Sequence, residues 1–251
     1  MTRVRVLHLY ANELGINGDR GNVLALVRRL EWRGVQVEVI EGAVGHALPA
    51  EVDLVHIGSG PRSARDAVLP DILTKAAVLQ RWVTAGVPLI AVGAGMQVLG
   101  RRIVGIDGVE RSGVGILPLT VRDSNVRAVG EVLGEPRGAV RLAGFVNHGV
   151  TIELHEAEAL TVLDRGPGNA GVVDVSDRGE GVRVGSLIGT HLGGPVLPMN
   201  PMLADELLSA ALARHALTLP EPEERVAHVD ELARRSRAAI AARLGRAGVE
   251  V

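Results

Sequence analysis

The stretch Gly86-Val-Pro-Leu-Ile-Ala-Val-Gly-Ala-Gly-Met-Gln-Val-Leu-Gly100 decides the fold of this chain of 251 residues. Its apolar part, Val87 to Val92, is typical of a buried parallel strand. Small residues at 93–95 then make a tight turn, and residues 96–99 are expected to begin a helix. A strand, sharp turn and helix of this kind form the nucleophile elbow of α/β enzymes, which lifts one side chain above the sheet edge. The apex is normally Cys or Ser, but here it is Gly93, and the chain contains no cysteine.

Segments on either side of the elbow alternate between strand and helix patterns. The alternation predicts an α/β fold with a doubly wound, mostly parallel sheet in a flavodoxin-like three-layer sandwich. The helix expected over 70–85 carries Pro70 in its first turn, where proline is tolerated. The other expected helices cover 23–33 and 201–217, and the expected strands of the sheet cover 4–9, 35–40, 53–57, 87–92 and 182–188.

Beyond residue 112 the pattern changes to short β-like runs separated by Gly, Asp and Asn. Such runs predict mixed or antiparallel strands, so we expect an antiparallel β insertion between the last strands of the main sheet. The runs cover residues 114–120, 140–145, 151–154, 160–164 and 171–175.

A further amphipathic helix is expected over residues 223–244, after a break at Pro220 and Pro222. We therefore divide the chain into a main domain over 1–217 and a C-terminal helical extension over 218–251. The helix either docks a partner or packs on its own domain through Val226, Val229, Leu232, Ile240 and Leu244.

The bulk composition excludes several classes of function. A formal net charge of −2 gives no basic field for nucleic acid. Only Tyr10, Trp32, Trp82 and Phe145 are aromatic, so stacking platforms are not expected. No cysteine means no disulfide and no thiolate metal site. No signal region and no apolar run of about 20 residues is visible, which predicts a cytoplasmic protein without a membrane span.

Four segments carry a resemblance to a known family. They are Gly18-Asp-Arg-Gly-Asn22, Ala91–Gly100, Gly144-Phe-Val-Asn-His-Gly149 and Ile188-Gly-Thr-His-Leu-Gly-Gly-Pro-Val-Leu-Pro-Met-Asn-Pro201. Over about residues 4 to 215 the chain resembles the class I glutamine amidotransferases of the cobyric-acid-synthase-like branch. Within that branch it is most similar to the GatD-type glutaminase subunits of lipid II isoglutaminyl synthase.

The resemblance breaks at the catalytic positions. Aligned without gaps, the family's catalytic Cys falls on Gly93 and its catalytic His falls on Gly193. Pro61 stands where the family's glycine-rich loop continues with Gln, and Val146 stands where the family has an acid. Four departures together favour natural divergence over one deliberate substitution. The resemblance therefore predicts a fold that has kept its backbone and lost the nucleophile and base of glutamine hydrolysis.

The resemblance also implies a set of ligand-binding residues. Family members form the oxyanion hole from backbone N–H groups, which here belong to Gly58, Ser59, Gly60 and Ala94. Arg127 and His148 are each either ligand contacts or ordinary surface and strand-end residues, while Asn147 keeps its family position. His191 lies near the site as a replacement base or, alternatively, as a residue used for packing or hydrogen bonding. The motif over 18–22 either binds an anion at a helix N-terminus or folds on its own Asp and Asn side chains.

By resemblance, the partner is a Mur-ligase-like protein in a heterodimer. The ligase would bring ATP and Mg²⁺, and this chain is expected to hold no cofactor or metal. The expected function is a non-catalytic subunit that supports amidation or attachment of a small amine or amino acid at the D-glutamate α-carboxyl of peptidoglycan precursors. Two alternatives stay open: an amide hydrolase that pairs Ser59 with His191 or His148, and a binding module that senses an amino acid.

Overall fold

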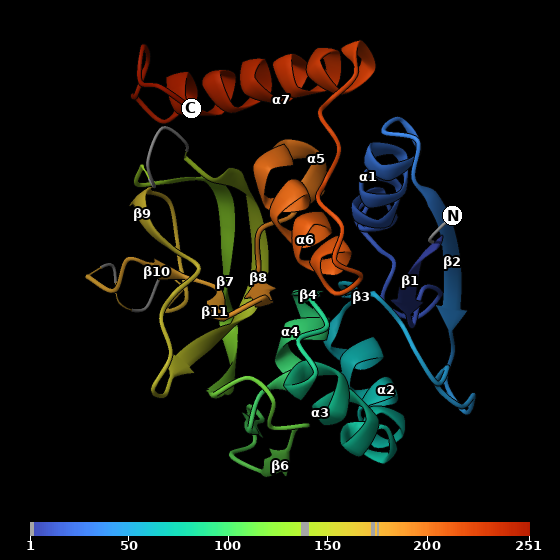
Figure 1. The fold of residues 1–251 in the computed structure, drawn as a ribbon. Coiled ribbons are helices and arrows are strands. Elements are labelled where there is room, and N and C mark those ends of the chain that lie inside the picture. The colour runs from blue at the N-terminus through green and yellow to red at the C-terminus, as the bar shows by residue number, and fades with distance from the viewer. Residues whose placement is uncertain (1–2, 137–140, 172–173, 175) are drawn as a thin grey trace.

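The main sheet has the strand order β11-β12-β4-β3-β1-β2, and all of its strands except β11 run parallel (Figure 1). The computed structural model describes residues 3–136, 141–171, 174 and 176–251. The doubly wound α/β fold predicted from the sequence is confirmed. The strands are β1 Arg3–Leu9, β2 Gln36–Gly42, β3 Leu54–Ile57, β4 Leu89–Val92, β11 Val182–Val184 and β12 Leu187–Thr190.

Helices cover both faces of this sheet (Figure 1). On one face lie α1 (Arg20–Glu31), α5 (Val196–Met199) and α6 (Pro201–Ala213), and on the other lie α2 (Arg62–Thr74), α3 (Ala76–Thr84) and α4 (Ala94–Leu99). Because successive side chains of a strand point to opposite faces, each strand feeds two cores. Val4 and Val6 of β1 join the core beneath α1 and α6, while Leu7 and Leu9 join the core beneath α2, α3 and α4.

A second, mainly antiparallel sheet forms the predicted β insertion. Its order is β10-β9-β7-β5-β6, and β8 pairs with β7 in a long hairpin. The helix α7 (Glu224–Arg243) crosses over the ends of β7 and β8 and contacts α5 (Figure 1). The strands are β5 Arg102–Val104, β6 Glu110–Ser112, β7 Leu119–Gly134, β8 Ala143–Leu154, β9 Thr161–Arg165 and β10 Gly179–Glu180.

The expected helix over 70–85 is wrong. The structure has two helices there, and Pro70 lies inside α2 instead of in a first turn. Proline removes one helical hydrogen bond and costs about 3 kcal/mol in a helix interior. Burial of Val68, Leu69 and Ile72 against the sheet offsets that cost.

The insertion differs from the expectation in two places. The run over 114–120 is strand only from Leu119, because the amides of Val114 and Leu117 bond to the end of α4. The polar continuation of β7 as far as Gly134 was missed, since its composition is typical of a turn. Of the expected run over 171–175, residues 172, 173 and 175 lie outside the described residues, as does Val140.

On α7 the expected apolar face is partly wrong. Val226 and Ile240 are buried, whereas Leu232 is 46% exposed. The buried stripe runs instead through Ala233 and Arg237, which keep the helical spacing that Leu232 breaks. Within the part of the chain that the structure describes, no helix has both the length and the apolar character to cross a bilayer.

Candidate functional site

The elbow is built as the sequence predicts, at the carboxyl end of β4. Gly93 has φ +50° and its N–H donates to the carbonyl of Thr190 at 2.8 Å, while the N–H of Gly95 donates to the carbonyl of Gly58 at 3.0 Å. A Cβ placed on Gly93 would lie 2.4 Å from Oγ of Ser59. Real Cβ atoms do not approach an oxygen so closely. The serine hydroxyl therefore occupies the space in which an elbow side chain would begin.

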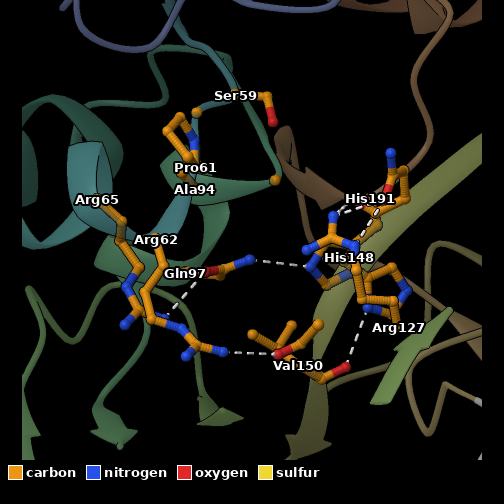
Figure 2. Close-up of a pocket in the computed structure, with 14 residues that line it drawn as sticks. Ser59, Pro61, Arg62, Arg65, Ala94, Gln97, Arg127, His148, Val150 and His191 are labelled. Carbon is orange, nitrogen blue, oxygen red and sulfur yellow. Dashed lines mark hydrogen bonds between the residues drawn. The ribbon is translucent and has the colours of Figure 1, made fainter. Parts of the chain in front are cut away.

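A polar cavity of about 320 Å³ opens beside this turn (Figure 2). It brings together Gly93 and all the ligand-binding residues expected from the sequence except Gly58. Gly58 faces away because its carbonyl is bonded to α4 and its Cα packs against Leu14 and Asp19. The expected residues that line the cavity are Ser59, Gly60, Ala94, Arg127, Asn147, His148 and His191.

A second cavity of about 340 Å³ lies on the other side of Ser59. It is lined by Gly193, the position at which the sequence resemblance predicts the catalytic imidazole, and by Asp19. The two cavities share Ser59, Asn147 and His191 as a common wall. The vestigial nucleophile and base positions thus face different spaces, one on each side of that wall.

Two imidazoles stack against one another at the wall. The rings of His148 and His191 lie with centroids 4.0 Å apart and planes at 16°. Nδ1 of His148 lies 3.0 Å from the carbonyl of Val150, and since a carbonyl only accepts, this nitrogen carries the proton. The remaining nitrogen, Nε2, is then an acceptor, and it is buried without a hydrogen-bond partner among the described residues.

The protonation of His191 follows from its neighbour Gln97. Oε1 of Gln97 accepts from Nη1 of Arg65 at 3.2 Å, which fixes the amide so that its Nε2 faces Nε2 of His191 at 3.3 Å (Figure 2). The imidazole therefore accepts at Nε2 and keeps its proton on Nδ1, which is buried without a partner in the described structure. Burial and the adjacent His148 hold the pKa of His191 well below its ordinary value. His148 and His191 therefore form a neutral stacked pair, in which Nδ1–H of His191 is an unused donor and Nε2 of His148 an unused acceptor among the described residues.

Stability should fall in acid because of this pair. Burial lowers the pKa of His148 to about 4 from 6.5, so the unfolded chain binds a proton in this window that the folded chain does not. The stabilisation is complete above the unfolded pKa and is lost as the pH falls toward the folded one. When the pH is lowered from about 7.5 to about 5, we expect the contribution of His148 to reduce the free energy of unfolding by about 2 kcal/mol.

Urea unfolding of the chain and of His148→Asn at both pH values measures this loss, since the other histidines are common to both proteins. The variant should lose about 2 kcal/mol less on acidification. The exposed His46→Asn serves as the matched control and should behave as the parent chain does. Equal acid sensitivity of parent and His148→Asn would contradict the assignment.

Three guanidinium groups line the first cavity. Arg65 is fully buried and makes a bidentate pair with Asp123 at 2.7 and 2.9 Å. Arg62 is more exposed and donates to the carbonyls of Ser124 and Gly149 at 3.2 and 3.4 Å. Arg127 is held by Oδ1 and the carbonyl of Asn147. The cavity is therefore rich in N–H donors, a property that suits an anionic or carboxylate-bearing ligand.

Sequence reasoning missed Gln97, Arg62 and Arg65. A signal for Gln97 was present, because it follows Gly93 by one helical turn of α4 and so lies on the same side. For the arginines there was none, since the sequence does not show that a buried Asp123 lies opposite them.

The family motifs outside the cavity act as structural clamps. Asn22 accepts the N–H of Leu197 at 2.9 Å, and its amide donates to Asp19 at 3.2 Å. Gly21 allows Pro195 to approach, because a Cβ there would lie 2.6 Å from the ring. The structure thus supports the alternative in which the motif over 18–22 folds on its own side chains. Val146 is fully buried in the core and lines neither of the two cavities described above.

Comparisons with known proteins agree with this architecture. A model of the CobB/CobQ-like glutamine amidotransferase domain matches residues 5–201. The chain is 29% identical over 225 residues to the lipid II isoglutaminyl synthase (glutamine-hydrolyzing) subunit GatD of Staphylococcus aureus strain N315, a match that covers 89% of this chain and 90% of that protein. It is 26% identical over 216 residues to the subunit of the same name from Streptococcus pneumoniae strain ATCC BAA-255 / R6, covering 84% and 82%.

Solved structures share the fold at lower identity. A glutamine amidotransferase crystal structure superposes with a TM-score of 0.55 at 16% identity and covers 82% of this chain and 98% of its own. A glutamine amidotransferase from Thermotoga maritima gives a TM-score of 0.54 at 17% identity and covers 98% and 96%. These similarities concern the arrangement of the strands and helices.

Proposed function

Because this chain belongs to the CobB/CobQ-like glutamine amidotransferase family, we propose that it is a GatD-type subunit without glutaminase activity of its own. It binds a Mur-ligase-like partner as a heterodimer. With that partner it supports amidation or amine attachment at the D-glutamate α-carboxyl of peptidoglycan precursors. ATP and Mg²⁺ belong to the ligase in this proposal.

The observation that carries the proposal is the glycine at the elbow. Hydrolysis of a glutamine amide in this family needs a thiolate to attack and an imidazole to pass the proton to the leaving ammonia. Gly93 supplies no side chain, and Ser59 Oγ fills the space above it. Gly193 supplies no imidazole, and its backbone pairs with Phe145 through bonds of 2.8 and 3.2 Å. The fold and the donor-rich cavity support a subunit that still binds while its own hydrolytic chemistry is lost.

The neighbouring histidines do not replace the missing dyad. Nε2 of His191 faces the Gln97 amide, and Nδ1 of His148 is committed to Val150. Both rings stay neutral through burial. The cavity therefore suits the capture of a small amino acid, whose carboxylate the guanidinium groups would face, while a simple amine such as ammonia would have to enter uncharged.

A comparison of amine donors tests the proposal. The chain is reconstituted with its Mur-ligase-like partner, ATP, Mg²⁺ and the peptidoglycan precursor, and is offered glutamine, ammonium or glycine separately. We expect amidated or aminoacylated product from ammonium or glycine, and none from glutamine above the level of the ligase alone. Product from glutamine as sole nitrogen source would contradict the absence of glutaminase activity.

One observation favours a second candidate function, an amide hydrolase that uses Ser59. The hydroxyl of Ser59 lies where the elbow nucleophile would begin, in the same cavity as His191 and His148. Against it, neither imidazole is hydrogen-bonded to Ser59 in the described structure, and a serine nucleophile needs that bond to a base. The same donor experiment separates the two: glutamine-dependent product that disappears with Ser59→Ala would assign the hydrolase.

A further inference from the structure

Three side chains of types that bind metals converge beneath α1, apart from the stacked pair His148 and His191. His8 of β1 and His56 of β3 are register partners on neighbouring parallel strands. Both follow, by two residues, an apolar side chain that joins the core beneath α1, so the strand period places them on that face. Asp19 immediately precedes α1 and lies over them. One ligand atom from each of the three residues lies within 4.8 Å of the others.

The cluster is buried and incompletely hydrogen-bonded. His8 is 3% exposed, Asp19 4% and His56 0%. Both ring nitrogens of His56, Nε2 of His8 and Oδ2 of Asp19 have no hydrogen-bond partner among the described residues. An unsatisfied buried polar atom costs about 1–3 kcal/mol, and buried polar groups normally have partners. Because one ligand atom from each of the three residues also lies within 4.8 Å of the others, the cluster indicates a missing ligand that accepts electron pairs.

We propose that His8, Asp19 and His56 bind a divalent first-row transition metal ion. Two imidazoles and one carboxylate are a donor set that Zn²⁺, Fe²⁺ and Co²⁺ accept, and they leave open positions for a further ligand. Nε2 of His56 and Oδ2 of Asp19 lie 3.3 Å apart. Two ligands at about 2.0–2.1 Å from zinc and at a tetrahedral angle are separated by about 3.3 Å. Only the third donor has to move closer.

The carboxylate of Asp19 is also held from outside the cluster. The amide of Asn22 donates to Oδ1 of Asp19 at 3.2 Å and orients the carboxylate as partners outside the coordination shell do in metal sites.

A bound metal ion would connect three segments of the chain close to Ser59. Asp19 lies against Gly58, where a Cβ would come within 2.2 Å of Oδ2, and it also lines the second cavity. An ion bound by the three residues would link β1, β3 and the turn before α1 directly beneath the loop that carries Ser59. This proposal stands on these residues alone and does not depend on the amidotransferase-like function.

The test is metal binding by the purified chain. After removal of metal with a chelator and dialysis against Zn²⁺, elemental analysis should find one ion per chain. Co²⁺ in its place should give visible d–d absorption of a low-coordinate site. The melting temperature should rise with Zn²⁺ and return to the metal-free value with chelator.

Variants locate the ion. His8→Phe with His56→Phe keeps two aromatic rings in the core, and Asp19→Asn keeps the outer hydrogen bonds as a second route should the first fail to fold. Each should weaken Zn²⁺ binding by more than the roughly 10- to 100-fold that outer partners contribute. Two control variants, His46→Ala at an exposed position and His148→Asn in the stacked histidine pair, should bind Zn²⁺ as the parent chain does. Zn²⁺ retention that is unchanged in the cluster variants, or a parent chain that retains none, would overturn the proposal.

Discussion

Purified chain given glutamine should release ammonia at a rate lower by about 10⁴ to 10⁶ than a relative whose elbow carries cysteine, because losses of this size follow removal of a nucleophile or base in comparable hydrolases. Backbone donors at the turn remain, yet oxyanion stabilisation without a nucleophile leaves the amide bond intact. A coupled assay for ammonia, with the chain alone and then with its partner, measures the difference. Turnover at an ordinary enzymatic rate would show that another group performs the attack.

Restoring the thiol alone should not repair the activity. Gly93→Cys places a side chain at φ +50° and within 2.4 Å of Ser59 Oγ. The strained conformation alone costs about 1–3 kcal/mol, and the overlap adds to it. We expect the variant to lose roughly 2–4 kcal/mol of unfolding free energy and to stay inactive, since residue 193 still supplies no imidazole.

Two companion variants separate the causes. Gly86→Cys has φ +75° but no heavy atom within 4 Å of its Cβ, so it reports conformational strain alone. Ser59→Gly in the Gly93→Cys background removes the overlap and should recover the excess loss. If Gly93→Cys is no less stable than Gly86→Cys, the hydroxyl of Ser59 moves aside freely and does not fill the elbow.

Arg65→Met should destabilise the fold by about 3–5 kcal/mol, because removing one partner of a buried ion pair leaves the other charge without compensation. Asp123 has a side chain only 3% exposed and would keep only Nε of Arg62, 3.3 Å away. The hydrogen bond that orients the Gln97 amide toward His191 would also be lost. Urea unfolding of the variant measures the effect.

A surface ion pair provides the control. Arg234 donates to Glu231 on the exposed side of α7 at 2.7 Å, and Arg234→Met should leave the free energy of unfolding almost unchanged because water screens an exposed ion pair. If Arg65→Met loses as little unfolding free energy as Arg234→Met, water reaches Asp123 and solvates its charge.

The α/β architecture could be predicted from the sequence because apolar runs and turn residues are local signals. The elbow could be predicted for the same reason, since residues 87–99 contain the strand, the turn and the helix start. The hairpin β7–β8 could not be predicted, because the polar stretch of β7 has no local strand signal and is stabilised by its pairing with β8. Pro70 inside α2 is a similar case, in which tertiary burial overrides a local preference.

For the candidate site, the sequence predicted the backbone turn and most of the residues that line the cavity. It did not predict the contacts that these side chains make with one another. That Ser59 occupies the elbow, and that His148 stacks on His191, depend on contacts between separate loops. His8 and His56 were not noticed, because each is an isolated histidine in an apolar strand. Only the register of β1 on β3 makes them neighbours.

Sharing one wall gives the two cavities a thermodynamic consequence. Ser59, Asn147 and His191 belong to both spaces, so a guest that shifts any of these side chains on one side reshapes the other. Linkage then requires that each guest alter the affinity of the other by the same factor. In the proposed non-catalytic subunit, a ligand bound in one cavity would therefore change the affinity of the other cavity for its own ligand.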